Sequence, residues 1–222
     1  YEAKGVNISL DEFRGLGMTL YEVVLPEVDG EDKSKPLKEL ISGMEQFLSG
    51  MLSIVAKDDT KDYNKNYLVL EIANANGSDQ FIFYVAVPNA HKQLFEKQII
   101  SIFHNAIITE ATSDYNIFNT DGVSVGSYLE ATVNPIYQFK TYENFDHDPM
   151  NVILNSFSKI DKDGQGAGMQ IVFAPKGDYF LKNYKYAIEQ IEKGESVKDA
   201  TYIPETVTGG LGKTLKLFFK AP

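Results

Sequence analysis

The stretch TLYEVVLP, at residues 19–26, opens the segment that decides the fold, which extends to Val87. It is followed by KPLKELISGMEQFLSGMLSI at 35–54, by NYLVLEIANA at 66–75 and by DQFIFYVAVP at 79–88. The first stretch and the last two place apolar residues at every second position, which is typical of strands with one buried face. The segment therefore predicts a strand, a helix and two further strands.

Apolar side chains form one continuous stripe along the predicted helix, because they recur at intervals of three and four residues. The stripe consists of Leu37, Leu40, Ile41, Met44, Phe47, Leu48, Met51 and Leu52. Pro36 suits the first helical turn, where its missing N–H has no intrahelical partner to lose. Gly43 and Gly50 each weaken the helix by up to about 1 kcal/mol relative to alanine, so packing on a sheet has to hold it.

The predicted strands have well-defined apolar faces. They are Tyr21, Val23 and Leu25 in the first strand, then Leu68, Leu70 and Ile72, and then Phe81, Phe83, Val85 and Val87. Asn76 and Gly77 tolerate positive φ, which predicts a hairpin between the last two strands. Pro88 ends the second of them.

A second helix is predicted at residues 89–104, with Asn89 as its N-cap. Its buried stripe is Leu94, Phe95, Ile99, Ile102 and Phe103. A short strand from Ala106 to Ala111 completes the order β-α-β-β-α-β, which is that of a ferredoxin-like sandwich. The predicted fold class is therefore α+β, with a ferredoxin-like domain at 18–112 that follows an N-terminal arm at 1–17.

The second half predicts another, incomplete α+β unit at 125–194, which the turn-rich link at 112–124 separates from the first. This unit opens with a long strand or bent pair from Val125 to Tyr142. Pro135 lacks a donor for the sheet ladder, so this element is kinked or at a sheet edge. A loop-rich tail at 195–222 ends the chain, and its LKLFF sequence favours a terminal strand.

Two helices flank a strand in this second unit. The first helix runs from Pro149 to about Lys159, with Asp148 as its N-cap. The strand MQIVFAP follows at 169–175, and the last helix, from about Tyr179 to Lys193, ends at Gly194 as its C-cap. The predicted buried stripes are Met150, Ile153, Leu154, Phe157 and Ile160 in the first helix, and Phe180, Tyr184, Ala187, Ile188 and Ile191 in the last.

Composition narrows the function classes. The chain of 222 residues has a formal net charge of −10, which disfavours unaided binding to the phosphates of nucleic acid. It contains no cysteine, so thiolate nucleophiles, disulfides and cysteine metal sites are absent. No apolar run approaches the roughly 20 residues of a membrane-spanning helix, and no signal peptide is visible. Because the sequence begins at Tyr1 and not at Met, we expect an excised or processed piece.

Three short motifs are weak matches to ligand sites. GGLGKT at 209–214 lacks the first glycine of a phosphate-binding loop, because Val207 stands at that position. DKDGQG at 161–166 lacks the bidentate glutamate of a calcium loop, because Val172 stands at the twelfth position. The adjacent residues Asp146, His147 and Asp148 do not converge easily on one ion. The sequence therefore predicts neither a metal nor a cofactor.

No catalytic residue is predicted either. The sequence has no nucleophile elbow with an ordered Ser, His and Asp, and its carboxylates fall in loops or on polar faces. His91 and His104 are thirteen residues apart and are expected at the helix surface. The aromatic run DYFLKNYKY instead suggests Tyr179 and Tyr186 as partner contacts, since tyrosine is favoured at interfaces. The alternative is that these tyrosines cover the sheet.

Three stretches resemble a family of large bacterial proteins from reduced-genome lineages. They are TLYEVVLP with the helix after it, YVAVPNAHKQLFEKQIISIFHNAIITEATSDY, and DPMNVILNSFSKIDKDGQGAGMQIVFAP. In that family this region, matched here over about residues 18–175, lies between N-terminal membrane segments and a conjugation-type (type IV secretion, DNA-translocase-like) ATPase domain. The nucleotide-binding loop of the family lies downstream and matches no position here, so the resemblance implies no catalytic residue.

The resemblance implies a non-catalytic, membrane-proximal assembly domain of a type IV secretion or conjugative DNA-transfer ATPase, and not an enzyme. Its partners would be proteins: its own downstream ATPase domain, secretion-complex subunits, or further copies in a homo-oligomer. It would meet no nucleic acid directly, and it would reach the membrane, on the cytoplasmic face, only through segments outside this chain. Two alternatives stay open: a free-standing adaptor or structural module, cell-surface or phage-related, and a small-ligand hydrolase with an acidic site.

Overall fold

The computed structural model describes most of the chain between residues 17 and 201. The described residues are 2–3, 6–7, 17–25, 37–54, 67–74, 80–112, 117–118, 121–129, 137, 139–160, 165–175 and 179–201, with the backbone alone at 2–3, 6–7, 37–40 and 179. They belong to two compact units, one formed by residues 1–123 and 141–175 and the other by residues 124–140 and 176–222. The motif GGLGKT, the Asn76-Gly77 turn and the LKLFF stretch lie outside the described residues.

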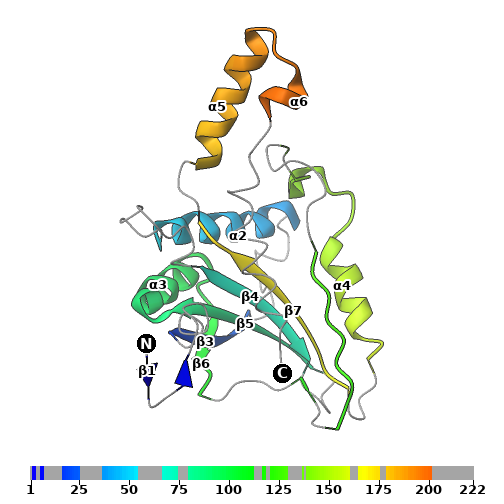
Figure 1. Ribbon diagram of the computed structural model, residues 1–222. Coiled ribbons are helices and arrows are strands. Elements are labelled where there is room, and N and C mark those ends of the chain that lie inside the picture. Colours follow the sequence, from blue (N-terminus) through cyan, green and yellow to red (C-terminus); the bar gives the residue numbers. More distant parts are fainter. Residues whose placement is uncertain are drawn as a thin grey trace. The chain divides into compact units, whose positions relative to one another are not determined.

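The first unit is built on a five-stranded antiparallel sheet in the order β6-β3-β5-β4-β7 (Figure 1). The strands are β3 (Met18–Val24), β4 (Leu68–Asn74), β5 (Phe81–Pro88), β6 (Ile107–Glu110) and β7 (Ala167–Phe173). Two further strands of two residues each, β1 (Glu2–Ala3) and β2 (Val6–Asn7), pair with each other. The predicted α+β class is confirmed.

Strand β7 comes from the half of the chain that the sequence assigns to a second unit. It pairs with β4 along its whole length, from Leu68 opposite Phe173 to Asn74 opposite Ala167. The sheet therefore has one strand more than the four of a ferredoxin-like sandwich. Local sequence patterns did not predict this pairing, because the sequence of a strand does not specify the sheet edge with which it pairs.

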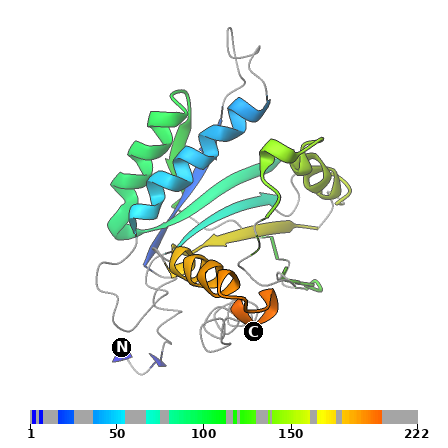
Figure 2. The ribbon, with the colours of Figure 1, turned by 90° about the horizontal axis from the view of Figure 1, so that it is seen from above.

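Two helices lie side by side over the same face of this sheet (Figure 2). Helix α2 (Leu37–Met51) continues into the 3₁₀ turn η2 (Leu52–Ile54), and α3 (Lys92–Ile102) follows the 3₁₀ turn η3 (Asn89–His91). The order β3, α2, β4, β5, α3, β6 is the predicted β-α-β-β-α-β order. Phe47 and Met51 of α2 and Phe95 and Ile99 of α3 are buried against the strands, and this burial stabilises the helices.

The core lies between these two helices and the sheet. Its buried members are Tyr21, Val23, Phe47, Met51, Ile54, Leu68, Val85, Val87, Phe95 and Ile99. Strand pairing sets Tyr21 and Leu70 opposite Val85, so the predicted apolar faces share one side of the sheet. The Phe95 ring packs against Tyr21 at 4.9 Å and meets Phe47 edge-on at 6.0 Å between ring centroids, a favourable aromatic geometry.

The two glycines of α2 face α3. A Cβ on Gly43 would come within 3.2 Å of Ile102 Cγ2 and of the Phe103 ring, and a Cβ on Gly50 would overlap the Gln98 side-chain amide. Gly43 therefore allows α2 and α3 to approach closely, whereas the neighbour of Gly50 is the far end of a flexible side chain. The close approach offsets the helix propensity that Gly43 costs.

Some details of the predicted helices and strands are wrong. Leu52 is exposed because the tighter 3₁₀ turn gives the buried position to Ile54 instead. Leu25 is also exposed, since β3 ends one residue before it. Asn89 is not an N-cap: its side chain accepts a hydrogen bond from Thr19 on β3. Between Val125 and Tyr142, the described residues lie in no strand.

Helix α4 (Pro149–Phe157) begins as predicted, two residues after an exposed His147. Asp148 Oδ1 accepts a hydrogen bond from the Met150 N–H at 2.9 Å, and Pro149 occupies the first turn. At its other end, the Phe157 ring meets Phe81 edge-on at 5.8 Å. The short 3₁₀ turn η4 (Tyr142–Asn144) precedes this helix.

The described part of the second unit includes a helical hairpin. Helix α5 (Tyr179–Glu192) turns back into the short α6 (Val197–Ala200). Gly194 has φ +96° and ends α5 as predicted, with its N–H donating to the Ile191 carbonyl and the Glu195 N–H donating to the Gln190 carbonyl. Ser196 then caps α6 through the Asp199 N–H. Among the described residues, no helix is both long and apolar enough to cross a membrane.

Candidate functional site

The tyrosines singled out by the sequence both belong to α5. Tyr186 is 60% exposed, so most of its side chain is accessible to a partner. Tyr179 is the first residue of the helix, and its side chain lies outside the described part. The two residues are seven positions apart, which is two helical turns, so they leave α5 on similar sides. Their role as partner contacts stays a prediction.

The stripe predicted to be buried on α5 is only partly buried. Ala187 is buried, and Phe180 and Tyr184 are half-buried, as predicted. Ile188, however, is 56% exposed, and Ile191 is exposed as well. Within the described part of this unit, the helix that packs on α5 is α6, whose four residues cover a small part of the fourteen-residue helix.

The exposed face of α5 combines apolar and charged side chains. Its members are Leu181, Lys182, Lys185, Tyr186, Ile188, Glu189 and Glu192, all exposed. At 100° per residue they fall within one arc of about 160° on the helix. Leu181 and Ile188, 54% and 56% exposed, lie at one edge of this arc and Tyr186 lies at the other, so apolar area flanks the charges on both sides. We call these seven residues the α5 face.

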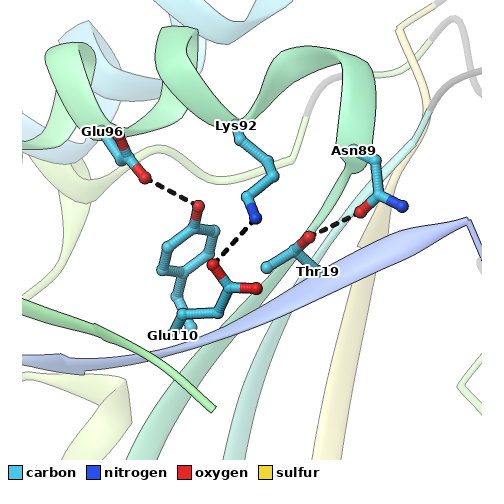
Figure 3. Close-up of polar contacts among 6 residues, drawn as sticks. Thr19, Asn89, Lys92, Glu96 and Glu110 are labelled. Atoms are coloured by element: carbon cyan, nitrogen blue, oxygen red, sulfur yellow. Dashed lines mark hydrogen bonds and ion pairs between the residues drawn. The ribbon is translucent and has the colours of Figure 1, made fainter. Parts of the chain in front are cut away.

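A second cluster of polar side chains joins β3, α3 and β6 in the first unit (Figure 3). The Lys92 ammonium lies 2.8 Å from a Glu110 carboxylate oxygen, so α3 is tied to β6. The Thr19 hydroxyl donates to Asn89 Oδ1 at 2.5 Å, which ties β3 to the start of η3. These contacts fix the first turn of α3 over the sheet.

The Tyr21 hydroxyl donates to the Glu96 carboxylate at 2.8 Å in the same cluster. Burial raises the pKa of Tyr21 well above its ordinary value, and the hydrogen bond to Glu96 and the negative charges of Glu96 and Glu110 raise it further. A phenol with so high a pKa keeps its proton at neutral pH and does not serve as a base. The cluster therefore suits a structural link better than proton transfer.

A similar bond joins α2 to the turn before α4. The Tyr142 hydroxyl donates to Glu45 at 2.9 Å, and this hydrogen bond, followed by burial and nearby carboxylates, raises the pKa of Tyr142. Periodicity gave no signal for either tyrosine–glutamate pair, because the partners are 75 and 97 positions apart in the sequence.

The remaining sequence candidates stay apart. Asp148 is engaged as the cap of α4, while Asp146 and His147 beside it are exposed. His104 lies in the turn after α3, not on the helix as predicted, and its exposed ring is within 3.1 Å of the Ile100 carbonyl oxygen. His91 belongs to η3. Within the part of the chain that the structure describes, no three His, Asp or Glu side chains come together as metal ligands would.

A family model, "Domain of unknown function (DUF8128)", matches residues 32–200. The chain belongs to this family. The DUF8128 match begins after β3 and ends with α6, so it includes the α5 face and most of the sheet. No curated protein and no solved structure matches this chain.

Proposed function

We propose that this chain is a non-catalytic assembly domain that works through protein–protein contacts. The observation that carries the proposal is the α5 face, where a tyrosine and two aliphatic residues stay exposed beside two lysines and two glutamates. Interfaces are enriched in tyrosine and bury apolar side chains at their centre. Leu181 and Ile188 are a little over half exposed, so burying the rest of each against a partner is favourable by roughly 1 kcal/mol.

The polar cluster favours the same role for the first unit. Tyr21, Lys92 and Thr19 each hold a partner on another element, which rigidifies the sheet and α3. A rigid unit of this kind loses little conformational entropy when it binds another protein. It therefore suits a domain that positions other parts of an assembly.

The assembly we propose is a type IV secretion or conjugative DNA-transfer machine. Support comes from the resemblance of residues 18–175 to the region that precedes the ATPase domain in such proteins. The partners would be the downstream ATPase domain of the parent protein, subunits of the secretion complex, or further copies of the chain. The parent protein would hold the domain at the cytoplasmic face of the membrane, and the net charge of −10 leaves DNA handling to other domains.

The test is a calorimetric binding titration. It measures the affinity of the 222-residue chain for the region encoded directly downstream in the parent gene. We expect binding by the wild type and at least about tenfold weaker binding by a Tyr186→Ala, Ile188→Ala variant, because interface anchors cost more than 1 kcal/mol when truncated. Val152→Ala is the matched control, since Val152 is an exposed aliphatic residue on α4.

Three outcomes would contradict the proposal. The first is ATP hydrolysis by the 222-residue chain itself. The second is tight binding of duplex DNA, and the third is equal binding to partners by the wild type and the Tyr186→Ala, Ile188→Ala variant. A parent gene without a nucleotide-binding loop after a strand would favour the free-standing adaptor instead.

A further inference from the structure

The charges on α5 are arranged against the preference of an isolated helix. Lys182 and Lys185 lie in its first half, and Glu189 and Glu192 lie in its last turn. The helix dipole favours acidic residues at the N-terminus and basic ones at the C-terminus, by about 0.3–1 kcal/mol each. A lysine that precedes a glutamate by four residues, as Lys185 precedes Glu189, is also the less favourable orientation of that pair.

The same order of charges is complementary to itself when two copies run antiparallel. With Ala187 at the midpoint, Lys182 of one copy lies level with Glu192 of the other, and Lys185 lies level with Glu189. In such an antiparallel pair like edges of the two faces meet, so Tyr186 lies beside Tyr186 of the second copy at one edge and Ile188 beside Ile188 at the other. Lys185 of each copy then faces Glu189 of the other at the centre of the contact, and apolar area is buried on both sides of these two ion pairs.

Net charge supports this choice of partner. The chain carries −10 overall, whereas the four charged residues of the α5 face sum to zero. Two identical acidic chains repel each other in general. The repulsion is smallest where they meet through a surface that is neutral overall and carries opposite charges at its two ends. Antiparallel packing also places the dipoles of the two helices in their favourable orientation.

We propose that the α5 face binds a second copy of this chain through an antiparallel α5–α5 contact centred on Ala187. The proposal rests on the proposed function, because it names the partner of the same surface. Ala187 is buried on the opposite side of α5, so the contact leaves the packing inside the second unit unchanged.

Two charge-reversed variants of the full chain test the pairing. One is Lys182→Glu with Lys185→Glu, which makes the face wholly acidic, and the other is Glu189→Lys with Glu192→Lys, which makes it wholly basic. Both changes suit the helix dipole better than the wild type does, so neither variant is expected to lose α5. Circular dichroism checks that the helix content is kept.

The measurement is sedimentation equilibrium of each protein alone and of the two variants mixed. We expect the wild type to dimerise, each variant to have a dimer Kd at least about tenfold higher, and the mixture to form a one-to-one dimer as tight as the wild type. Added salt should weaken the wild-type dimer, since exposed ion pairs are screened.

The control is Lys97→Glu with Lys159→Glu, two exposed lysines outside α5 whose reversal gives the same net charge as the acidic variant. It should dimerise as the wild type does. A monomeric wild type, or two charge-reversed variants that fail to pair, would overturn the self-association. If the monomer still binds the downstream region through Tyr186, the proposed function survives while this inference fails; if neither contact forms, both fail.

Discussion

The Tyr21 hydroxyl, on β3, donates a 2.8 Å hydrogen bond to the Glu96 carboxylate on α3, which links the sheet to this helix. Tyr21 is only 2% exposed, and its ring also packs on Phe95. One side chain thus contributes to the apolar core with its ring and to the helix–sheet link with its hydroxyl. The two contributions are separable by substitution.

Replacing Tyr21 with Phe removes the hydroxyl and keeps the ring. We expect the free energy of unfolding to fall by about 1 kcal/mol, because Glu96 loses its donor but is exposed enough to bind water. Tyr21→Ala also removes the ring from the core and should cost about 3–5 kcal/mol. Urea denaturation followed by circular dichroism measures both, and equal losses in the two variants would contradict the separation.

The raised pKa of Tyr21 predicts a specific alkaline destabilisation. In the unfolded chain a tyrosine ionises near pH 10, whereas folded Tyr21 keeps its proton to higher pH. The folded state then binds more protons, so stability is fully present below pH 10 and falls by about 1.4 kcal/mol per pH unit above it. The Tyr21→Phe variant lacks this loss. The difference in unfolding free energy between the wild type and the variant should therefore become smaller between pH 9 and 11.

Gly166 and Gly50 allow a comparison between a rigid and a flexible neighbour. A Cβ on Gly166 would lie 2.5 Å from the Ile117 carbonyl oxygen and 2.8 Å from Ile117 Cα, and backbone atoms do not yield easily. The Cβ of Gly50→Ala meets the end of the Gln98 side chain, which is free to move. We expect Gly166→Ala to cost roughly 1–3 kcal/mol and Gly50→Ala to be neutral or stabilising. Thermal unfolding ranks the stabilities of the two variants. A greater loss in Gly50→Ala than in Gly166→Ala would contradict the expectation that the backbone neighbour yields less easily.

Asp148 provides a test of a cap that the sequence already predicts. Asp148→Ala removes the oxygen that accepts the Met150 N–H, and we expect a loss of about 1 kcal/mol in unfolding free energy. Asp146→Ala is the control, since Asp146 has the same charge and is exposed two residues earlier. Asp148→Asn should recover most of the loss, because asparagine is an equally good cap. Equal effects at both positions would point to net charge instead of capping.

The order of the elements was predictable because each signal is local. Periodicity located α2, α3 and the strands β3, β4 and β5, and the caps at Asp148 and Gly194 follow from single residues. The pairing of β7 with β4 was not predictable, because it joins segments about a hundred residues apart and depends on which edge stays open. For the same reason, the link from Tyr21 to Glu96 is visible only in the structure.

The candidate site was predictable in part. The aromatic run pointed to α5, and Tyr186 is exposed there. The same helical wheel assigned Ile188 to the buried side, because periodicity gives the direction of a stripe and not the extent of the neighbour that covers it. With α6 limited to four residues, Ile188 stays uncovered and joins the α5 face.

Gly194 fixes the end of the helix that carries the α5 face. Its φ of +96° is readily adopted by glycine and is strained for alanine, so Gly194→Ala should cost about 1 kcal/mol and fray the last turn of α5. Gly194→Asn is the matched control, because asparagine tolerates the left-handed region better than alanine. Amide hydrogen exchange at Ile191 and Glu192 should accelerate in the alanine variant and change less in the asparagine variant. Since Glu189, which pairs with Lys185 of the second copy, lies in the same last turn, a frayed turn should also weaken self-association. Unchanged exchange at both residues would rule out the capping role.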